Sequence, residues 1–294
     1  MRCIFCHESE KEFKNGNSWS KEHIIPYALG NHSLKIYNVC QKCNSGLGSN
    51  VDAYVNNHFL IAIIRQSLKL KSEEGNIPNP FATGKDDEGN IIRVSDDFEL
   101  SMEPVPKVND GVFKLQATDR ESAKKVIKTK LDRKGFDEKE IDSIMKTVDI
   151  TPSMPYQPNV RYDFTIEPAR FELEIIKIAY EYAITKLNDD YSKDPRAEEL
   201  RVFLNKAING EMKNKCDQIS GIASLNNDER LANMLRQLSI LHAHYLQFSA
   251  NKEGNLLLII SLFMEPCLTY IIKISDNASL YTFPKQSDII EITS

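Results

Sequence analysis

Long apolar runs and an excess of basic charge are both missing from this sequence of 294 residues. No apolar run approaches the length that crosses a bilayer, and the start of the chain lacks the basic, apolar and cleavage segments of a secretory signal. We therefore expect a soluble, cytoplasmic protein with no membrane partner. The net charge of -5 excludes a chain that is basic throughout, so any contact with nucleic acid must come from a local patch.

Cysteine is also scarce, but four of the six cysteines form two C-x2-C pairs. The pairs Cys3/Cys6 and Cys40/Cys43 have the spacing of a closed, structural Zn²⁺ site with four thiolate ligands. Disulfides are the alternative interpretation, which a reducing cytosol disfavours. The two remaining cysteines, Cys216 and Cys267, are expected to be ordinary buried thiols.

The segment between the cysteine pairs predicts two short strands and a loop. Residues 18–26 read as a strand that Pro26 terminates, residues 34–39 as a second strand, and residues 51–70 as a helix. Neighbouring side chains on a regular strand point to opposite faces, so Glu22 and His23 can serve one site only at a bulge or a strand end. The predicted order is strand, loop, strand, helix.

Three motifs together carry a family resemblance: Cys3-x2-Cys6, the run Ser20-Lys21-Glu22-His23-Ile24-Ile25-Pro26, and Cys40-x2-Cys43-Asn44. In this order they resemble the HNH endonucleases, the zinc-stapled branch of the ββα-metal nucleases, over about the first 60 residues. The resemblance implies that His23 is the general base and that Glu22 and Asn44 hold a divalent cation. A further asparagine braces the loop in this family. Strict spacing places it at Lys35, and Asn38 is the nearest substitute.

Phosphodiester hydrolysis needs these residue types independently of any family. An imidazole with a pKa near neutrality can deprotonate water, and carboxylate and carbonyl oxygens suit Mg²⁺ or Mn²⁺. Structural interpretations remain open: His23 bonded to backbone, Glu22 as a surface carboxylate, and Asn44 as a helix cap. Asp52 and His58 lie close in sequence and are substitute ligands or solvated residues.

The remainder of the chain predicts an α+β body. We expect a nuclease domain over residues 1–70 and an accessory domain over residues 71–294, with an internal boundary near 151–158, where prolines cluster. Helices are expected from Asp119, with Thr118 and Glu121 as its capping box, over about 168–187 and from Asp194. Short turns near the C-terminus predict an antiparallel meander of strands over 242–249, 256–264, 267–275 and 280–283. His242 and His244 share a face there but lack the partners of a metal site.

The helix from Asp119 is the most basic stretch. Lys124, Lys125 and Lys128 are candidate contacts to a DNA backbone, although a solvated charged face is the favoured explanation.

The sequence therefore predicts a metal-dependent endonuclease acting on DNA. The resemblance implies a role in bacterial restriction or phage defence, with a homo-oligomer or a partner protein of a defence system as candidate assemblies. Two alternatives stay open: an effector nuclease gated by a ligand or partner through its C-terminal body, and a noncatalytic zinc module that binds nucleic acid.

Overall fold

The computed structural model divides the chain into two compact units by its internal contacts. Unit 1 combines Met1–Pro78 with Ile166–Ser294, and unit 2 is Asn79–Thr165. The division into a nuclease domain over residues 1–70 and an accessory domain over 71–294 is one of function and stays a prediction. The predicted internal boundary near 151–158 falls largely on residues that are not described. The residues that the structure describes are 1–97, 99–102, 105–109, 112–117, 119–147, 158–187, 189–225, 229–238 and 242–293.

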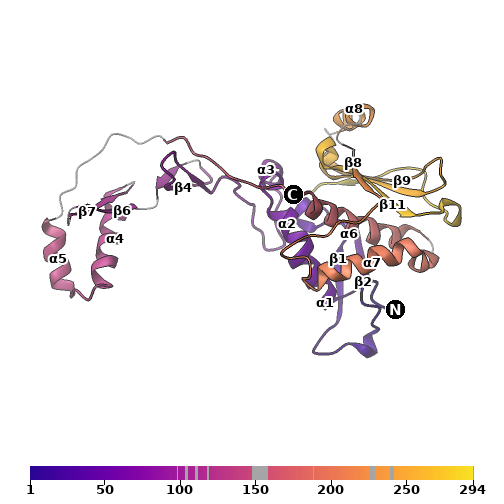
Figure 1. The fold of residues 1–294 in the computed structure, drawn as a ribbon, viewed down its shortest axis with the longest axis horizontal. Helices are drawn as coiled ribbons and strands as arrows, with labels where there is room; N and C mark the ends of the chain where they lie inside the picture. Colours follow the sequence, from indigo (N-terminus) through magenta and orange to yellow (C-terminus); the bar gives the residue numbers. More distant parts are fainter. Residues whose placement is uncertain are drawn as a thin grey trace. The chain divides into compact units, whose positions relative to one another are not determined.

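Unit 1 begins with two antiparallel strands and a helix (Figure 1). Strand β1 (Trp19–His23) pairs with β2 (Lys35–Cys40), and α1 (Gln41–Leu47) follows directly. The register shifts between Ser20 and Glu22, which is the predicted bulge, and the strand ends one residue later. The last two side chains of β1, those of Glu22 and His23, are both buried. The predicted succession of strand, loop and strand is confirmed, and helix α1, which follows it directly, was not predicted.

The single helix predicted over residues 51–70 is wrong. The helical path breaks at His58, whose backbone is extended (φ -65°, ψ 138°) and whose Nδ1 accepts a hydrogen bond from the backbone N–H of Leu60 at 3.3 Å. His58 thus caps a new helix in the way that side-chain acceptors cap helix N-termini. The observed segments are the π-helical turn η3 (Gly48–Asp52), α2 (Ala53–Asn57) and α3 (Phe59–Ser67).

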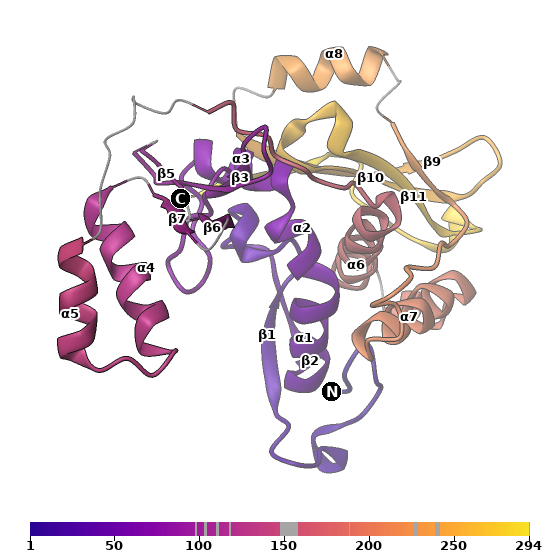
Figure 2. The same cartoon turned by 60° about the vertical axis from the view of Figure 1, so that its left-hand side comes forward.

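Two long helices form the middle layer of unit 1 (Figures 1 and 2). Helix α6 (Pro168–Lys186) and helix α7 (Pro195–Ile208) each begin with proline, which suits the first helical turn because its missing N–H would be unpaired there anyway. Both helices pack on the C-terminal sheet, and they also contact η3, with α6 reaching α2 and α7 reaching α1. Among the described residues, no helix has the length and apolar content needed to cross a membrane.

The C-terminal sheet has five antiparallel strands in the order β12-β9-β10-β11-β8. The predicted α+β class is confirmed, but the strand predicted over residues 280–283 is wrong. Residues Ala278–Leu280 form a 3-10 turn, and the edge strand beside β9 lies further along the chain. Short β8 and helix α8 (Glu229–Leu238) were not predicted. The strands are β8 (Ile222–Ser224), β9 (Ala243–Ala250), β10 (Leu256–Ser261), β11 (Thr269–Ser275) and β12 (Asp288–Glu291).

One hydrophobic core joins the N-terminal strands to this body. Phe5 packs on Tyr180 of α6 with ring centroids 5.6 Å apart, and the Tyr180 hydroxyl donates to the carbonyl of Ile4 at 2.8 Å. Arg201 of α7 donates to the carbonyl of Phe5 at 2.6 Å. These bonds satisfy the carbonyl groups of Ile4 and Phe5, which is how a buried loop avoids unpaired backbone. The first cysteine pair is therefore anchored on α6 and α7.

Unit 2 contains a three-stranded sheet, a hairpin and two helices. The helix expected from Asp119 is present, and the Asp119 carboxylate accepts from the backbone N–H of Ser122 at 2.8 Å as its N-cap. The predicted capping residue Thr118 lies outside the described residues. The elements are β3 (Thr83–Lys85), β4 (Ile91–Val94), β5 (Leu100–Met102), β6 (Val105–Asn109), β7 (Val112–Gln116), α4 (Arg120–Asp132) and α5 (Glu138–Thr147).

Candidate active site and cysteine cluster

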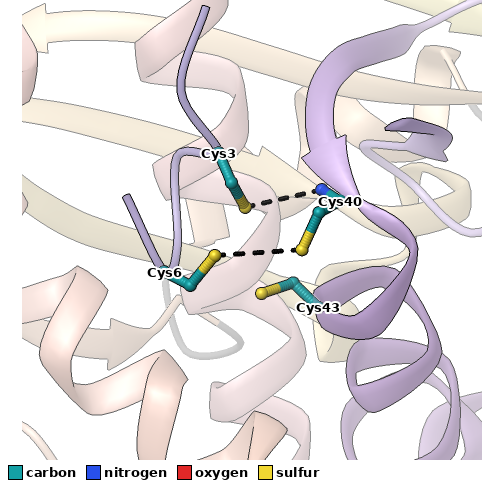
Figure 3. Close-up of side chains that lie close together, drawn as sticks. All are labelled: Cys3, Cys6, Cys40 and Cys43. Atoms are coloured by element: carbon teal, nitrogen blue, oxygen red, sulfur yellow. Dashed lines mark hydrogen bonds between the residues drawn. The ribbon is translucent and has the colours of Figure 1, made fainter. Parts of the chain in front are cut away.

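Four cysteines converge from two segments of unit 1 (Figure 3). Cys3 and Cys6 lie on the N-terminal loop, Cys40 ends β2, and Cys43 lies in the first turn of α1. Their sulfur atoms all lie within 4.8 Å of one another, and the Cys6 and Cys40 sulfurs are 3.8 Å apart. None of the four forms a disulfide. The predicted gathering of the two pairs is confirmed.

The sulfur spacing fits a tetrahedral metal site. Four thiolates at about 2.3 Å from a zinc ion lie about 3.8 Å from one another, which matches the Cys6–Cys40 separation. Three of the four residues are fully buried, so the cluster is closed to solvent except at Cys6. A hydrogen bond from the Cys43 thiol lowers the pKa of Cys3 to about 4, so the cluster already favours a thiolate. Such a donor set suits a structural ion with no open coordination position.

The other two cysteines stand apart from the cluster. Cys216 is half-buried and Cys267 is exposed, so the expectation that both are buried thiols is wrong. Cys267 is exposed because it lies in a 3-10 turn before β11 rather than within a strand.

A cavity of about 440 Å³ collects all three residues predicted as catalytic and one of their predicted substitutes. Glu22 and His23 at the end of β1, Asn44 on α1 and Asp52 at the end of η3 all line it. Unpredicted residues share the same lining, among them Asn56, Arg65 and Glu73. The predicted substitutes Asn38 and His58 are not among the lining residues.

His23 is buried in this cavity and is held neutral. Burial, with Lys35 and Lys21 nearby, lowers the pKa of His23 to about 4. Its Nδ1 lies 3.6 Å from Oε1 of Glu73, and its Nε2 is buried without a hydrogen-bond partner in the described chain. A neutral imidazole whose Nδ1 carries the proton presents Nε2 as an acceptor, and a buried acceptor without a partner calls for a ligand or water.

Glu22 and Asp52 share one cation, the ammonium of Lys177 on α6. The Lys177 Nζ lies 2.6 Å from Oε1 of Glu22 and 3.0 Å from Oδ1 of Asp52, and it donates to the carbonyl of His23 at 3.1 Å. Burial raises the pKa of Glu22 to about 7, although Lys177 opposes this shift. Burial also opposes the charge of Lys177, but Asp52 and Glu22 raise its pKa well above the ordinary value.

Two further carboxyl groups, Glu174 and Glu181, lie on α6 and are fully buried. Burial raises the pKa of both well above the ordinary value, which favours the neutral form of each. Neutral carboxyl groups add no charge to the site, which is how a carboxyl avoids the cost of unpaired burial. The carboxylates that the Lys177 ammonium contacts are those of Glu22 and Asp52.

Asn44 is oriented by β1. Its amide nitrogen donates to the Ser20 hydroxyl at 2.6 Å and to the carbonyl of Lys21 at 3.0 Å. Helix α1 begins at Gln41 with Cys40 as its N-cap, so the interpretation of Asn44 as a helix cap is wrong. With both bonds made by the nitrogen, the Oδ1 of Asn44 remains as the group that can ligate a cation.

The loop between β1 and β2 is braced by Asn31, which sequence reasoning missed. Its fully buried amide donates to the carbonyls of Ile25 and Leu34 at 2.7 and 2.9 Å, and its Oδ1 accepts from the N–H groups of Ser33 and Leu34. Neither of the predicted positions acts this way: Asn38 has a buried Oδ1 without a partner in the described chain. The polar triplet after Gly30 was the available signal, since asparagine commonly bonds loop backbone.

His244 is a structural link rather than a metal ligand. Its Nε2 pairs with the carbonyl of Leu29 at 3.0 Å, and its Nδ1 accepts from the N–H of Phe263 at 3.1 Å. Both ring nitrogens are used, and burial lowers the pKa of His244 to about 4. His244 thus ties β9 to the loop that Asn31 braces.

Lys177 and Arg65 are the other residues that sequence reasoning missed. The sequence held a signal for both, because each charged side chain lies at helical spacing from apolar residues that are buried. Arg65 is 4% exposed, donates through Nη1 to the carbonyl of Asn56 at 2.9 Å, and has a buried Nε without a partner in the described chain. It places a permanent positive charge in the lining of the cavity.

Comparison with known proteins agrees with the motif at the N-terminus. Residues 3–60 match the family model described as HNH endonuclease. Neither curated proteins nor solved structures gave a significant match to the chain. The match spans both cysteine pairs, β1, the braced loop, β2 and the helical segments that line the cavity. Residues 3–60 of this chain are therefore similar to HNH endonucleases.

Proposed function

We propose that the protein is a metal-dependent endonuclease that hydrolyses phosphodiester bonds of DNA. One observation carries the proposal: a single cavity brings together a neutral imidazole, two carboxylates and an oriented amide, in a segment of the HNH endonuclease family. This set supplies a base and hard oxygen ligands within one space. A noncatalytic zinc module would not need a buried histidine with an unused acceptor atom.

His23 is the proposed general base. Its imidazole is neutral throughout the physiological range because its pKa is about 4, so the base is always available. A low pKa also makes His23 a weaker base. A bound cation would compensate, because it lowers the pKa of the attacking water.

Glu22 and Asn44 are the proposed ligands of Mg²⁺ or Mn²⁺, with Asp52 beside them. The cation, when bound, would neutralise charge on the phosphoryl and leaving oxygens. The cysteine cluster is proposed to hold Zn²⁺ for structure alone, since four thiolates leave no position for substrate. Arg65 offers a guanidinium to a phosphate oxygen in the same cavity.

The test is plasmid nicking with a matched pair of proteins. Supercoiled DNA, single-stranded DNA and RNA are incubated with wild type or His23→Ala, with and without Mg²⁺ or Mn²⁺. We expect cation-dependent nicking of supercoiled DNA by wild type and a loss of about 10²- to 10⁴-fold in the variant. His242→Asn serves as control, because His242 is exposed and asparagine tolerates its positive φ of 44°. Equal nicking by His23→Ala, or cleavage of RNA alone, would refute the proposal.

A gated effector nuclease is the second candidate. It is favoured by α6, which packs on the C-terminal sheet and places Lys177 against two carboxylates of the cavity. A ligand that moved α6 would therefore move a residue in contact with the site. Defence against phage is the setting in which such gating is expected. Nicking that begins only after a nucleotide or a partner protein is added would support this candidate.

A further inference from the structure

Lys177 makes contacts that the proposed roles of Glu22, His23 and Asn44 do not require. It lies in the middle of α6 and is fully buried. Its ammonium reaches a carboxylate and a carbonyl at the end of β1 and a second carboxylate at the end of η3. An ammonium has three N–H donors, and these three acceptors match that capacity.

The contacts of Lys177 differ from an ordinary structural ion pair because all of its acceptor residues line the cavity. Glu22, Asp52 and His23 all line the same cavity, whereas the lysine that holds them comes from the layer behind it. A buried ion pair is weak evidence for stability, because apolar side chains of similar volume often serve equally well. Its better-supported use is to fix one geometry among several.

We propose that Lys177 is a positioning residue whose ammonium holds Glu22 and Asp52 as a converging carboxylate pair for one divalent cation. The inference rests on the proposed function and adds Asp52 to the cation site. Each carboxylate has two oxygens and can bind the ammonium through one while it offers the other to a cation. The same contact to the carbonyl of His23 fixes the backbone that carries the base.

Competition and positioning predict opposite effects of removing the Lys177 ammonium on cation binding. If the ammonium merely occupied the place of the cation, removing it would tighten cation binding, because one repelling charge would disappear. If it positions the pair, removing it leaves two neighbouring carboxylates that repel each other and move apart, and cation binding weakens. The sign of the change therefore decides between competition and positioning.

The experiment compares Lys177→Met with Lys186→Met, which removes an ion-paired lysine from the same helix away from the cavity. Mn²⁺ affinity is measured by electron paramagnetic resonance on zinc-loaded protein, with zinc content and thermal unfolding recorded for each variant. We expect the Mn²⁺ dissociation constant to rise at least tenfold in Lys177→Met and to stay unchanged in Lys186→Met. In the nicking assay kcat should fall at saturating DNA while KM stays near the wild-type value.

A second variant covers the case in which Lys177→Met fails to fold. Asp52→Asn keeps the shape of the side chain and leaves Lys177 in place, and it should raise the Mn²⁺ dissociation constant at least fivefold with zinc retained. Unchanged or tighter Mn²⁺ binding in either folded variant overturns the inference. Because Mn²⁺ binding is read without DNA, wild type that binds Mn²⁺ but nicks nothing would refute the proposed function alone.

Discussion

The cysteine cluster and the cavity lie in the same unit but draw their residues from the chain differently. The cluster needs only two short segments, each with its own C-x2-C pair, so local geometry almost completes it. The cavity joins the end of β1 to α1, η3 and α3, and its carboxylates are held by a lysine from α6. The cluster therefore takes all four ligands from two short segments, the first of which is anchored on α6 and α7, whereas the cavity takes its lining from several elements of the unit.

The two sites are therefore sensitive to different changes, the cluster to loss of a ligand and the cavity to loss of a charge partner. The N-terminal segment packs into the hydrophobic core of unit 1, and an ion in the cluster would add folding energy by joining its two cysteine pairs. The cavity instead contains buried charge, which costs free energy unless partners are placed well.

Cys40→Ser should have the largest effect, because it removes one of four ligands from a site whose ion contributes on the order of 10 kcal/mol. We expect loss of bound zinc, loss of hydrogen-exchange protection over residues 3–60, and loss of nicking. Cys216→Ser, which lies outside the cluster, should change none of these. A zinc-free Cys40→Ser protein with full protection would contradict the local role of the cluster.

Asn31→Ala should follow, because the Asn31 side chain makes four hydrogen bonds to loop backbone. Leaving these buried groups unpaired should lower the free energy of unfolding by about 3 kcal/mol, measured by urea denaturation. Asn38→Ala is the matched control and should cost less than about 1 kcal/mol, since the Asn38 Oδ1 has no partner in the described chain. Equal losses would show that Asn31 is not the specific brace.

The sequence was informative where a site is local. Cysteine spacing and the run from Glu22 to Pro26 indicated the cluster, the bulge and the strand order, because those features depend on neighbours within a few residues. The helix over residues 51–70 was wrong because its apolar spacing continues through the break at His58. Periodicity does not report a change of helix direction.

The sequence was uninformative where the site depends on distant packing. Lys177 looks like a surface residue of a long helix until α6 is seen to be covered on both sides, by the C-terminal sheet and by the N-terminal segment. Asn31 likewise acts through carbonyls whose positions follow from the loop conformation. Charged residues on an apolar helical face were the signal for Lys177, and the partners of such a residue come only from tertiary structure.

Mn²⁺ binding in the cavity should depend on pH, because the carboxyl group of Glu22 has a pKa of about 7. A proton competes with the cation for this carboxylate, so Mn²⁺ affinity should rise about tenfold per pH unit from pH 5 to 7 and level off above. His23, with a pKa of about 4, is already neutral in this window and contributes no change. Glu22→Gln should flatten the profile, and a flat wild-type profile would contradict this assignment.

The smallest effect is expected in unit 2, where Lys124, Lys125 and Lys128 are the candidate contacts to DNA. Lys124 already pairs with Glu121 at 2.9 Å and Lys128 with Asp142 at 3.4 Å, so much of their charge is balanced. The triple alanine variant should weaken duplex binding by less than about tenfold and lower the salt slope by about 1. A matched triple variant of the exposed lysines Lys206, Lys252 and Lys285 removes the same charge from unit 1. Equal losses in both variants would mean that overall charge, and not α4, governs the encounter with DNA.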